Sequence, residues 1–225
     1  MKIKVLYEDS NILAIEKPSG VLVHPDQRSK EKTIFDLFLK KYPKLEIVHR
    51  LDKETSGVML LAKNKKAHEF LKKQFQGREV KKIYHAIVAG NISKDREIIN
   101  KPIGRSPRDF RRHLAGRGAR GQMRESITEY KVLRRFTSGG EKYSYLEVRP
   151  KTGRTHQIRV HMKFINHPVV CDSLYNPVGP CPKGISRLAL HAQSIEFSAL
   201  GGSASGGRKI KVESSLPEEF KKMIK

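Results

Sequence analysis

The sequence contains few cysteines, few acidic residues and no long apolar runs. Its two cysteines, Cys171 and Cys181, are too few for a disulfide framework or a zinc site, so we expect a reducing compartment and a cytoplasmic protein. No apolar run approaches the roughly 18 residues that would span a bilayer. The first residues, MKIKVLYEDSNILAIEK, also lack the apolar core and cleavage site of a secretory signal. We therefore expect no membrane partner.

The histidines do not follow a metal-binding pattern. His156 and His161 are five residues apart, whereas two ligands on one helical face stand four apart, as in the H-E-x-x-H motif. The sequence also contains no Gly-rich phosphate loop and no dinucleotide fingerprint. It therefore predicts neither a metal site nor a cofactor.

Acidic residues are outnumbered two to one, because 46 Lys and Arg stand against 23 Asp and Glu, a formal net charge of +23. This excess predicts a polyanionic partner, since Lys and Arg that neutralise phosphates gain free energy from counterion release. Contact with anionic lipid, or a chain that is merely basic, is the alternative. One segment, RSPRDFRRHLAGRGARGQMR at residues 105–124, favours nucleic acid, because it holds seven arginines and a single acid.

The guanidinium groups of this basic segment suit RNA. Arginine binds phosphate bidentately and stacks on bases, and the glycines of the segment interrupt any helix. We predict a loop that is mobile alone and ordered on RNA, with RNA contacts from Arg111, Arg112, Arg117 and Arg120. A solvated insertion without a role is the alternative.

Apolar stretches and turn signals alternate along most of the chain. They predict strands at residues 3–9, 12–17, 46–49, 57–63, 79–90, 126–136, 142–150, 186–197 and 209–214. Helical spacing predicts helices at 33–43, 65–77, 154–165 and 216–225. Thr33 is the expected N-cap of the first helix and Gly77 the C-cap of the second, and Arg159 falls on the polar side of the third. The pattern indicates an α+β fold with a largely antiparallel mixed sheet and flanking helices, in a single domain over residues 1–225.

One acid lies in an unusually tight frame, HRLDKETSG at residues 49–57. Asp52 could cap a turn by accepting the amides of Thr55 or Ser56, which is the commonest role of an aspartate in such a loop. It could also be a metal ligand, although no second acid lies at ligand spacing. The third possibility is a reactive carboxylate at the end of a strand. Spacing alone favours the turn cap.

A family resemblance changes that balance. HRLDKETSGVMLLAK resembles the signature of the RluA family of pseudouridine synthases, in which HRLD-x-x-T-S-G carries a nucleophilic aspartate. The other family segments occur in order over roughly residues 5–200: DSNILAIEKPSGVLVHP, KKIYHAIVAG, KTGRTHQIRVHMKFINHPVVCDSLY and SRLALHAQSIEF. The resemblance implies the pseudouridine synthase catalytic fold. We do not expect the S4-type RNA-binding module that often precedes it in this family.

The resemblance also implies roles for single residues. Asp52 matches the catalytic aspartate, Tyr84 the active-site tyrosine, and Arg159 the basic residue that pairs with the aspartate. Arg50 matches the arginine that occupies the stack vacated by the flipped base. His49 and Arg154 match further motif positions, and we expect both to contact RNA. Four other residues match motif positions without an assigned role, namely Thr55, Ser56, His156 and Gln157.

The implied reaction converts specific uridines of structured RNA, either large-subunit (23S) rRNA or tRNA, to pseudouridine, with the enzyme acting as a monomer. One carboxylate suffices as nucleophile, because the uracil is rejoined through C5 and no water is added, whereas glycoside hydrolysis needs a second acid. A cation within about 4–6 Å keeps such a carboxylate ionised. A catalytically silent RNA-binding or ribosome-assembly protein of the same fold is the main alternative, and an RNA hydrolase is a third.

Overall fold

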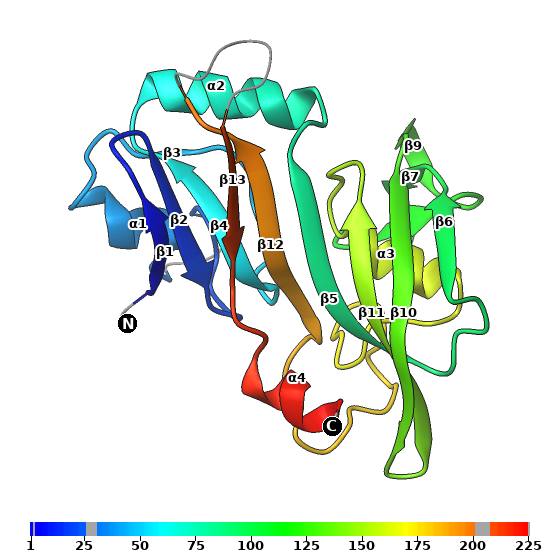
Figure 1. Cartoon of the computed structure of the whole chain (residues 1–225). Helices are drawn as coiled ribbons and strands as arrows, with labels where there is room; N and C mark the ends of the chain where they lie inside the picture. Colours follow the sequence, from blue (N-terminus) through cyan, green and yellow to red (C-terminus); the bar gives the residue numbers. More distant parts are fainter. Residues whose placement is uncertain (2, 26–30, 201–207, 225) are drawn as a thin grey trace. The chain divides into compact units, whose positions relative to one another are not determined.

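The computed structural model describes residues 1, 3–25, 31–200 and 208–224, which form two compact units (Figure 1). Unit 1 comprises Met1–Lys82 and Ala192–Ser215, and unit 2 comprises Ile83–His191 and Leu216–Lys225. Each unit has its own apolar core. The mixed α+β class predicted from the sequence is confirmed, with strands in the majority.

The sheet of unit 1 begins with β1 (Val5–Glu8), β2 (Ile12–Lys17) and β4 (Ser56–Ala62), which are neighbours in that order. β12 (Leu190–Ser198) follows β4, β13 (Lys209–Glu213) pairs with β12, and the short β3 (Glu46–Ile47) pairs with β4. All seven residues of β4 are buried, as expected of a strand covered on both faces.

Two helices in the described part of unit 1 complete it, and each has one end at a cap residue that the sequence predicts. α1 (Ile34–Leu39) starts at Thr33, whose hydroxyl accepts from the Asp36 amide at 3.3 Å while the Asp36 carboxylate accepts from the Thr33 amide at 2.9 Å. α2 (Lys65–Gln76) ends at Gly77, as predicted, and its apolar side chains join the core of this unit.

The sheet of unit 2 is antiparallel, with β5 (Lys81–Ala89), β11 (Glu141–Pro150), β10 (Ile127–Ser138) and β6 (Arg96–Asn100) as successive neighbours. Two helices belong to this unit, α3 (Gln157–Phe164) and α4 (Glu218–Met223). Ile158 and Met162 of α3 and Phe220 of α4 are buried in its core.

The basic segment forms a small second sheet within unit 2. β7 (Ile103–Arg105) pairs antiparallel with both β8 (His113–Ala115) and β9 (Arg120–Arg124). The prediction of a loop over residues 105–124 is therefore wrong for the parts that form β8 and β9. Gly116, Gly118 and Gly121 have positive φ, so they provide the left-handed turns that connect and bend these strands.

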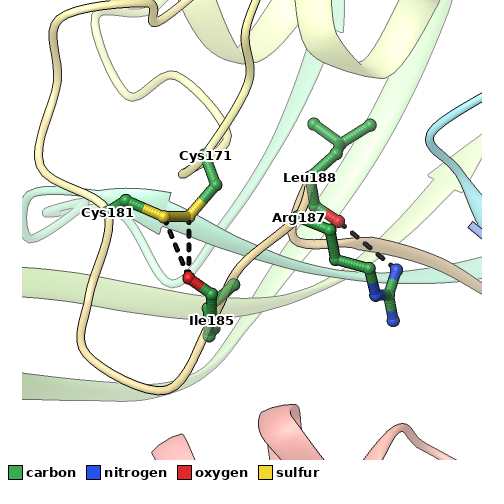
Figure 2. Close-up of a disulfide and its surroundings, with 5 residues drawn as sticks. All are labelled: Cys171, Cys181, Ile185, Arg187 and Leu188. Carbon is green, nitrogen blue, oxygen red and sulfur yellow. Dashed lines mark hydrogen bonds between the residues drawn. A yellow bond between two sulfur atoms is a disulfide. The ribbon is translucent and has the colours of Figure 1, made fainter. Parts of the chain in front are cut away.

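The two cysteines form a disulfide, Cys171–Cys181, which closes a short loop of unit 2 (Figure 2). Their sulfur atoms lie 3.6 and 3.0 Å from the carbonyl oxygen of Ile185. The cysteines therefore give no reason to expect a reducing compartment, contrary to the sequence-based argument. The spacing of ten residues does not reveal this pairing, because only the turn between the cysteines brings them together. None of the helices in the described ranges is long and apolar enough to cross a membrane.

Candidate functional site

Asp52 lies on the loop between β3 and β4 of unit 1, where it is partly exposed. A buried lysine holds this loop. The Lys17 ammonium, on a side chain that is 0% exposed, donates to the carbonyls of Pro18 at 3.0 Å, Lys53 at 2.9 Å and Thr55 at 2.8 Å. Since a buried ammonium is stable only when its donors are satisfied, these carbonyls and Lys17 fix one another.

The segment after Lys17 adds further anchors. The Gly20 amide donates to the Lys53 carbonyl at 2.8 Å, and the Ser19 hydroxyl donates to the Glu54 carbonyl at 2.6 Å. The Thr55 amide donates to the main-chain carbonyl of Asp52 at 3.1 Å. The backbone on the C-terminal side of Asp52 is therefore held in one conformation, as a reactive side chain requires.

A steric constraint explains why the T-S-G triplet ends in glycine. Gly57 has φ of +113°, and a Cβ at this position would overlap the backbone of Ala192 on β12. No side chain fits here, because the conformation and the space both exclude one. The triplet thus closes the Asp52 loop directly against the sheet of unit 1.

His49 makes its observed contacts with the protein itself. Its Nε2 accepts from the Leu60 amide at 2.9 Å, and its ring stacks on Phe75 with the centroids 4.8 Å apart. Burial, and to a lesser extent the nearby Lys82 ammonium, lowers the pKa of His49 to about 3, so the imidazole is neutral at physiological pH. Its contact with RNA stays a prediction. The neighbouring Arg50 is exposed.

The start of α3 is tied to the sheet of unit 2 through Gln157. Its Oε1 accepts from the Thr152 hydroxyl at 2.7 Å and from the Arg154 amide at 3.0 Å, and its Nε2 donates to the Ile127 carbonyl at 3.0 Å. His156, immediately before the helix, is left-handed with φ of +55°. These bonds fix the rotation of α3, and therefore the direction of the side chains that follow.

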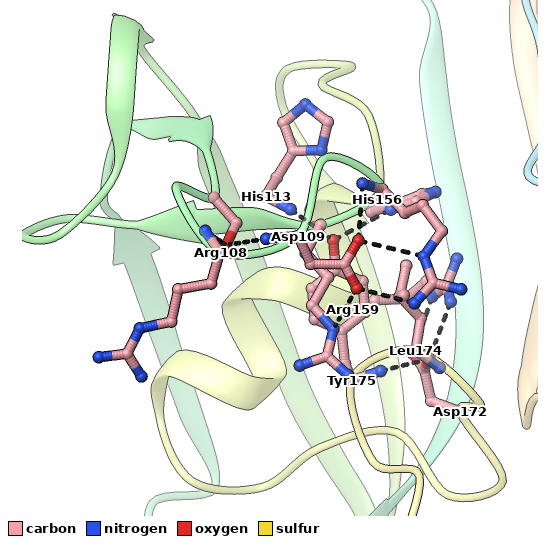
Figure 3. A network of polar contacts seen from close by, with 11 residues as sticks. Arg108, Asp109, His113, His156, Arg159, Asp172, Leu174 and Tyr175 are labelled. Atoms are coloured by element: carbon pink, nitrogen blue, oxygen red, sulfur yellow. Dashed lines mark hydrogen bonds and ion pairs between the residues drawn. The ribbon is translucent and has the colours of Figure 1, made fainter.

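Arg159 of α3 forms a bidentate ion pair with Asp172 (Figure 3). Its Nε donates to Oδ2 at 2.7 Å and its Nη2 to Oδ1 at 2.8 Å, with the two side chains 4% and 0% exposed. Oδ1 of Asp172 also accepts the amides of Leu174 and Tyr175, each at 2.9 Å. Arg159, which the sequence places on the polar side of the helix, is buried, because the 172–175 segment is packed against it.

Tyr175 joins this ion pair to the basic sheet. Its ring lies 5.2 Å from the Arg159 guanidinium carbon, and its hydroxyl accepts from the His113 amide of β8 at 2.9 Å. Nδ1 of His156 is 3.0 Å from the same hydroxyl. One tyrosine therefore contacts α3, its N-terminus and the small sheet (Figure 3).

Tyr84 lies on β5 opposite Val148 of β11 and packs, partly buried, against the core of unit 2. This is the ordinary environment of a strand tyrosine, and its catalytic role stays a prediction. The predicted RNA contacts Arg111, Arg117 and Arg120 are exposed on the small sheet, whereas Arg112 is half-buried. Arg154 donates through Nε to the Glu125 carbonyl at 2.9 Å.

Sequence reasoning missed four residues of these sites, namely Lys17, Lys82, Asp172 and Tyr175. Lys17 ends an apolar strand, a position where the side chain of a lysine is ordinarily solvated. Burial also lowers the pKa of Lys82 to about 8. Asp172 and Tyr175 stand within a segment that the family resemblance covers, but no spacing rule relates them to Arg159. In the described ranges, no three His, Cys, Asp or Glu side chains gather in a group that could hold a metal ion.

Known proteins resemble the chain over most of its length. The profile of the family described as RNA pseudouridylate synthase matches residues 11–164. Ribosomal large subunit pseudouridine synthase D of Xanthomonas campestris is 36% identical over 99% of this chain and 68% of its own. The uncharacterized RNA pseudouridine synthase of Aquifex aeolicus is 43% identical over 77% of this chain and 56% of its own.

Two solved structures share the fold. Human RNA pseudouridylate synthase domain containing 1 superimposes with a TM-score of 0.81 at 27% identity, over 96% of this chain and 84% of that one. Human RNA pseudouridylate synthase domain containing 4 superimposes with a TM-score of 0.75 at 28% identity, over 96% of this chain and 89% of that one.

Proposed function

Because the chain belongs to the RNA pseudouridylate synthase family, we propose that it isomerises specific uridines of structured RNA to pseudouridine. The resemblance to the RluA family is confirmed by relatives that carry the name ribosomal large subunit pseudouridine synthase D. The pseudouridine synthase fold is confirmed by the two solved structures. The substrate and the roles of single residues belong to our proposal.

Asp52 is the proposed nucleophile. The observation that carries this assignment is the HRLD-x-x-T-S-G signature on a loop whose backbone is held by Lys17, Ser19 and Gly20. A nucleophile fixed in this way approaches its target without first losing conformational freedom, which supports a high effective concentration.

The reaction breaks the bond between C1′ and N1, turns the uracil, and forms a bond between C1′ and C5, from which a proton then leaves. The Asp52 carboxylate attacks the sugar or the base, and no water takes part. We propose that the ring and hydroxyl of Tyr84 face the detached uracil, and that the Arg159 cation keeps the nucleophile ionised. The ion pair with Asp172 holds Arg159 in one orientation and already matches its charge, so the second role rests on the family resemblance.

Large-subunit rRNA is the proposed substrate class, because the name of several relatives specifies it, and tRNA is the second pool to test. A target uridine must leave its stack, which costs a few kcal/mol. Exposed Arg50 is proposed to fill the vacated space. We also propose that RNA contacts come from the small sheet and its turns, through Arg111, Arg112, Arg117 and Arg120, from Arg154 of the same unit, and separately from His49 of unit 1. The enzyme is proposed to act as a cytoplasmic monomer.

Tritium release tests the reaction directly. RNA labelled at C5 of uridine is incubated with the protein, because isomerisation must exchange that hydrogen. Separate unmodified pools of large-subunit rRNA and tRNA identify the substrate. We expect release from the rRNA pool and none with Asp52→Asn.

The matched control is Asp95→Asn, which removes an exposed aspartate that pairs with Arg135 and lies outside the family signature segments. It should retain full release. Asp52→Asn should bind RNA with nearly unchanged affinity, so loss of release then reports chemistry. Binding without release by the unaltered protein, in both pools, would favour the silent RNA-binding alternative. Release by Asp52→Asn at the normal rate would disprove the nucleophile assignment.

A further inference from the structure

One large aromatic side chain is exposed within the basic sheet of unit 2. Phe110 is 71% exposed, and it lies on the turn of residues 106–112 that connects β7 to β8. Burying a phenylalanine side chain is worth roughly 1.5–3 kcal/mol, so folding alone gives no reason to leave one in water. Single exposed apolar residues are nevertheless common, and exposure by itself identifies no site.

The turn that carries Phe110 is closed by its own polar groups. The Ser106 amide donates to the Arg112 carbonyl at 3.0 Å, and the Arg112 amide donates to the Asp109 carbonyl at 2.9 Å. The Ser106 hydroxyl accepts the amides of Arg108 and Asp109 at 3.3 and 3.4 Å. The turn therefore has a defined conformation, which presents Phe110 at an ordered position.

Asp109 completes this turn from its centre. Its Oδ1 accepts from the backbone amide of Arg111 at 2.9 Å and from the Nε of the same arginine at 3.1 Å. Its Oδ2 accepts from the Nη2 of Arg111 at 2.8 Å. Arg112 lies within 3.5 Å of Oδ2. The single acid of the turn is thus engaged by arginines, which leaves Phe110 in surroundings of net positive charge.

Arginines and an aromatic ring together are the groups that bind single-stranded RNA. Guanidinium groups bind phosphates, and exposed rings stack on unpaired bases of loops and bulges. Arg108 extends away from the polar network of this region, and Arg111 is 64% exposed. A basic lipid-binding surface would bury several apolar side chains together, whereas this turn carries one ring among arginines.

The turn also has a rigid base. Ile103 and Ala115 of the small sheet are buried against Val160 and Tyr175, and the Tyr175 hydroxyl accepts the His113 amide next to the turn. Phe110 is therefore held at a fixed position relative to α3, the helix that carries Arg159. A base stacked on it would set the register of the RNA on unit 2.

We propose that Phe110 stacks on an unpaired base of the substrate RNA while the arginines of the 106–112 turn bind the adjacent phosphates. This rests on the proposed function for the identity of the substrate, and it deepens that proposal by requiring an unpaired nucleotide in addition to the target uridine. Phe110 is thereby a residue that determines specificity for loops and bulges over continuous duplex.

A single-tryptophan variant tests the contact directly, since the natural sequence contains no tryptophan. Phe110→Trp places the fluorophore on the turn, and Ile98→Trp, at a position of β6 that is 62% exposed, is the matched control. We expect an RNA hairpin with an unpaired loop to quench the fluorescence of Phe110→Trp strongly and a duplex of equal length to quench it weakly. The fluorescence of Ile98→Trp should respond to neither.

Affinity measurements separate stacking from charge. Phe110→Ala should weaken hairpin binding about 5- to 100-fold, the range expected for loss of one stacked base, and should leave the salt dependence unchanged because no charge is removed. Phe110→Tyr should retain affinity because it keeps the flat ring, whereas Phe110→Leu should not. Ile98→Ala should bind like the unaltered protein, and circular dichroism confirms that each variant is folded.

The outcomes distinguish this inference from the proposed function. Tritium release by the unaltered protein, together with unquenched Phe110→Trp and normal binding by Phe110→Ala, would overturn the stacking contact alone. Quenching of Phe110→Trp by RNA, without any tritium release by the unaltered protein, would support the contact and refute the isomerase. Quenching by vesicles containing phosphatidylserine, but not by the hairpin, would assign the turn to a lipid surface and overturn the proposal.

Discussion

Two of the arginine–aspartate pairs of unit 2 have nearly the same bidentate geometry and very different surroundings. Arg159 and Asp172 share two hydrogen bonds at 2.7 and 2.8 Å with side chains 4% and 0% exposed. Arg111 and Asp109 share two at 3.1 and 2.8 Å with side chains 64% and 20% exposed. The chemical groups are identical, so burial and the surrounding contacts make the difference.

The buried pair is a net-neutral unit with a fixed orientation, because its guanidinium cannot reorient without breaking bonds in a low dielectric. In the exposed pair, the Arg111 guanidinium can exchange the Asp109 carboxylate for a phosphate, because water and salt weaken the attraction between the two side chains. The same ion pair therefore suits a positioning role inside the protein and a substrate-binding role on its surface. Four experiments test that division, in order of decreasing expected effect.

The largest effect should follow from breaking the buried pair. Asp172→Asn leaves the Arg159 charge buried without a matching anion, and such losses destabilise by about 3–5 kcal/mol. Urea denaturation should show a large fall in midpoint for this variant and a much smaller fall for Asp109→Asn. Replacing both partners, as Arg159→Met with Asp172→Leu, should recover much of the stability. Equal midpoints for the two asparagine variants would mean that burial does not determine how much each pair contributes to stability.

A smaller loss should follow from releasing the segment that carries Asp172. Cys171 directly precedes Asp172, and its disulfide with Cys181 closes a loop with a sequence separation of ten. Removing it through Cys171→Ser with Cys181→Ser should lower stability by about 2–3 kcal/mol, the loop-closure value for this length. Thermal melting with and without dithiothreitol checks this. The reductant should lower the melting temperature of the natural protein and leave the double variant unaffected.

The exposed pair should matter for RNA binding instead. Arg111→Ala with Arg112→Ala should weaken RNA binding about tenfold at 0.15 M salt and reduce the salt slope by about 1.4, if each contacts one phosphate. Lys221→Ala with Lys222→Ala on α4 removes the same net charge and serves as the control. An identical slope in both double variants would show that the basic turn does not contact phosphates.

The smallest effect concerns protonation of the exposed pair. The hydrogen bond from the Arg111 side chain, its amide and the nearby charges lower the pKa of Asp109 from 3.8 to about 2. The ionised carboxylate is the form that the turn binds, so this stabilisation is complete above pH 3.8 and disappears as the pH falls through about 2. A carboxyl NMR titration should find this midpoint, and Arg111→Ala should raise it toward 3.8. A midpoint at the ordinary aspartate value in the natural protein would show that the exposed pair does not persist in solution.

Local chemistry is what the sequence by itself determined. The Thr33 N-cap and the Gly77 helix end were predicted correctly, because their hydrogen bonds join residues only a few positions apart. The approximate positions of the helices and of most strands followed from the spacing of apolar residues, whereas β6 and the three strands of the small sheet were not predicted. The HRLD-x-x-T-S-G signature identified the family, and the excess of Lys and Arg indicated a polyanionic partner.

Only the tertiary structure decided which distant groups meet. Lys17 contacts the Asp52 loop across 36 and 38 residues, and Arg159 meets Asp172 across 13. The disulfide and the small sheet built from an Arg- and Gly-rich segment were likewise absent from the sequence predictions. Periodicity describes how each residue faces its own element, whereas these contacts depend on how separate elements pack. The sequence therefore placed Arg159 on the polar side of its helix, and only the packing of the 172–175 segment against that side determines that Arg159 is buried.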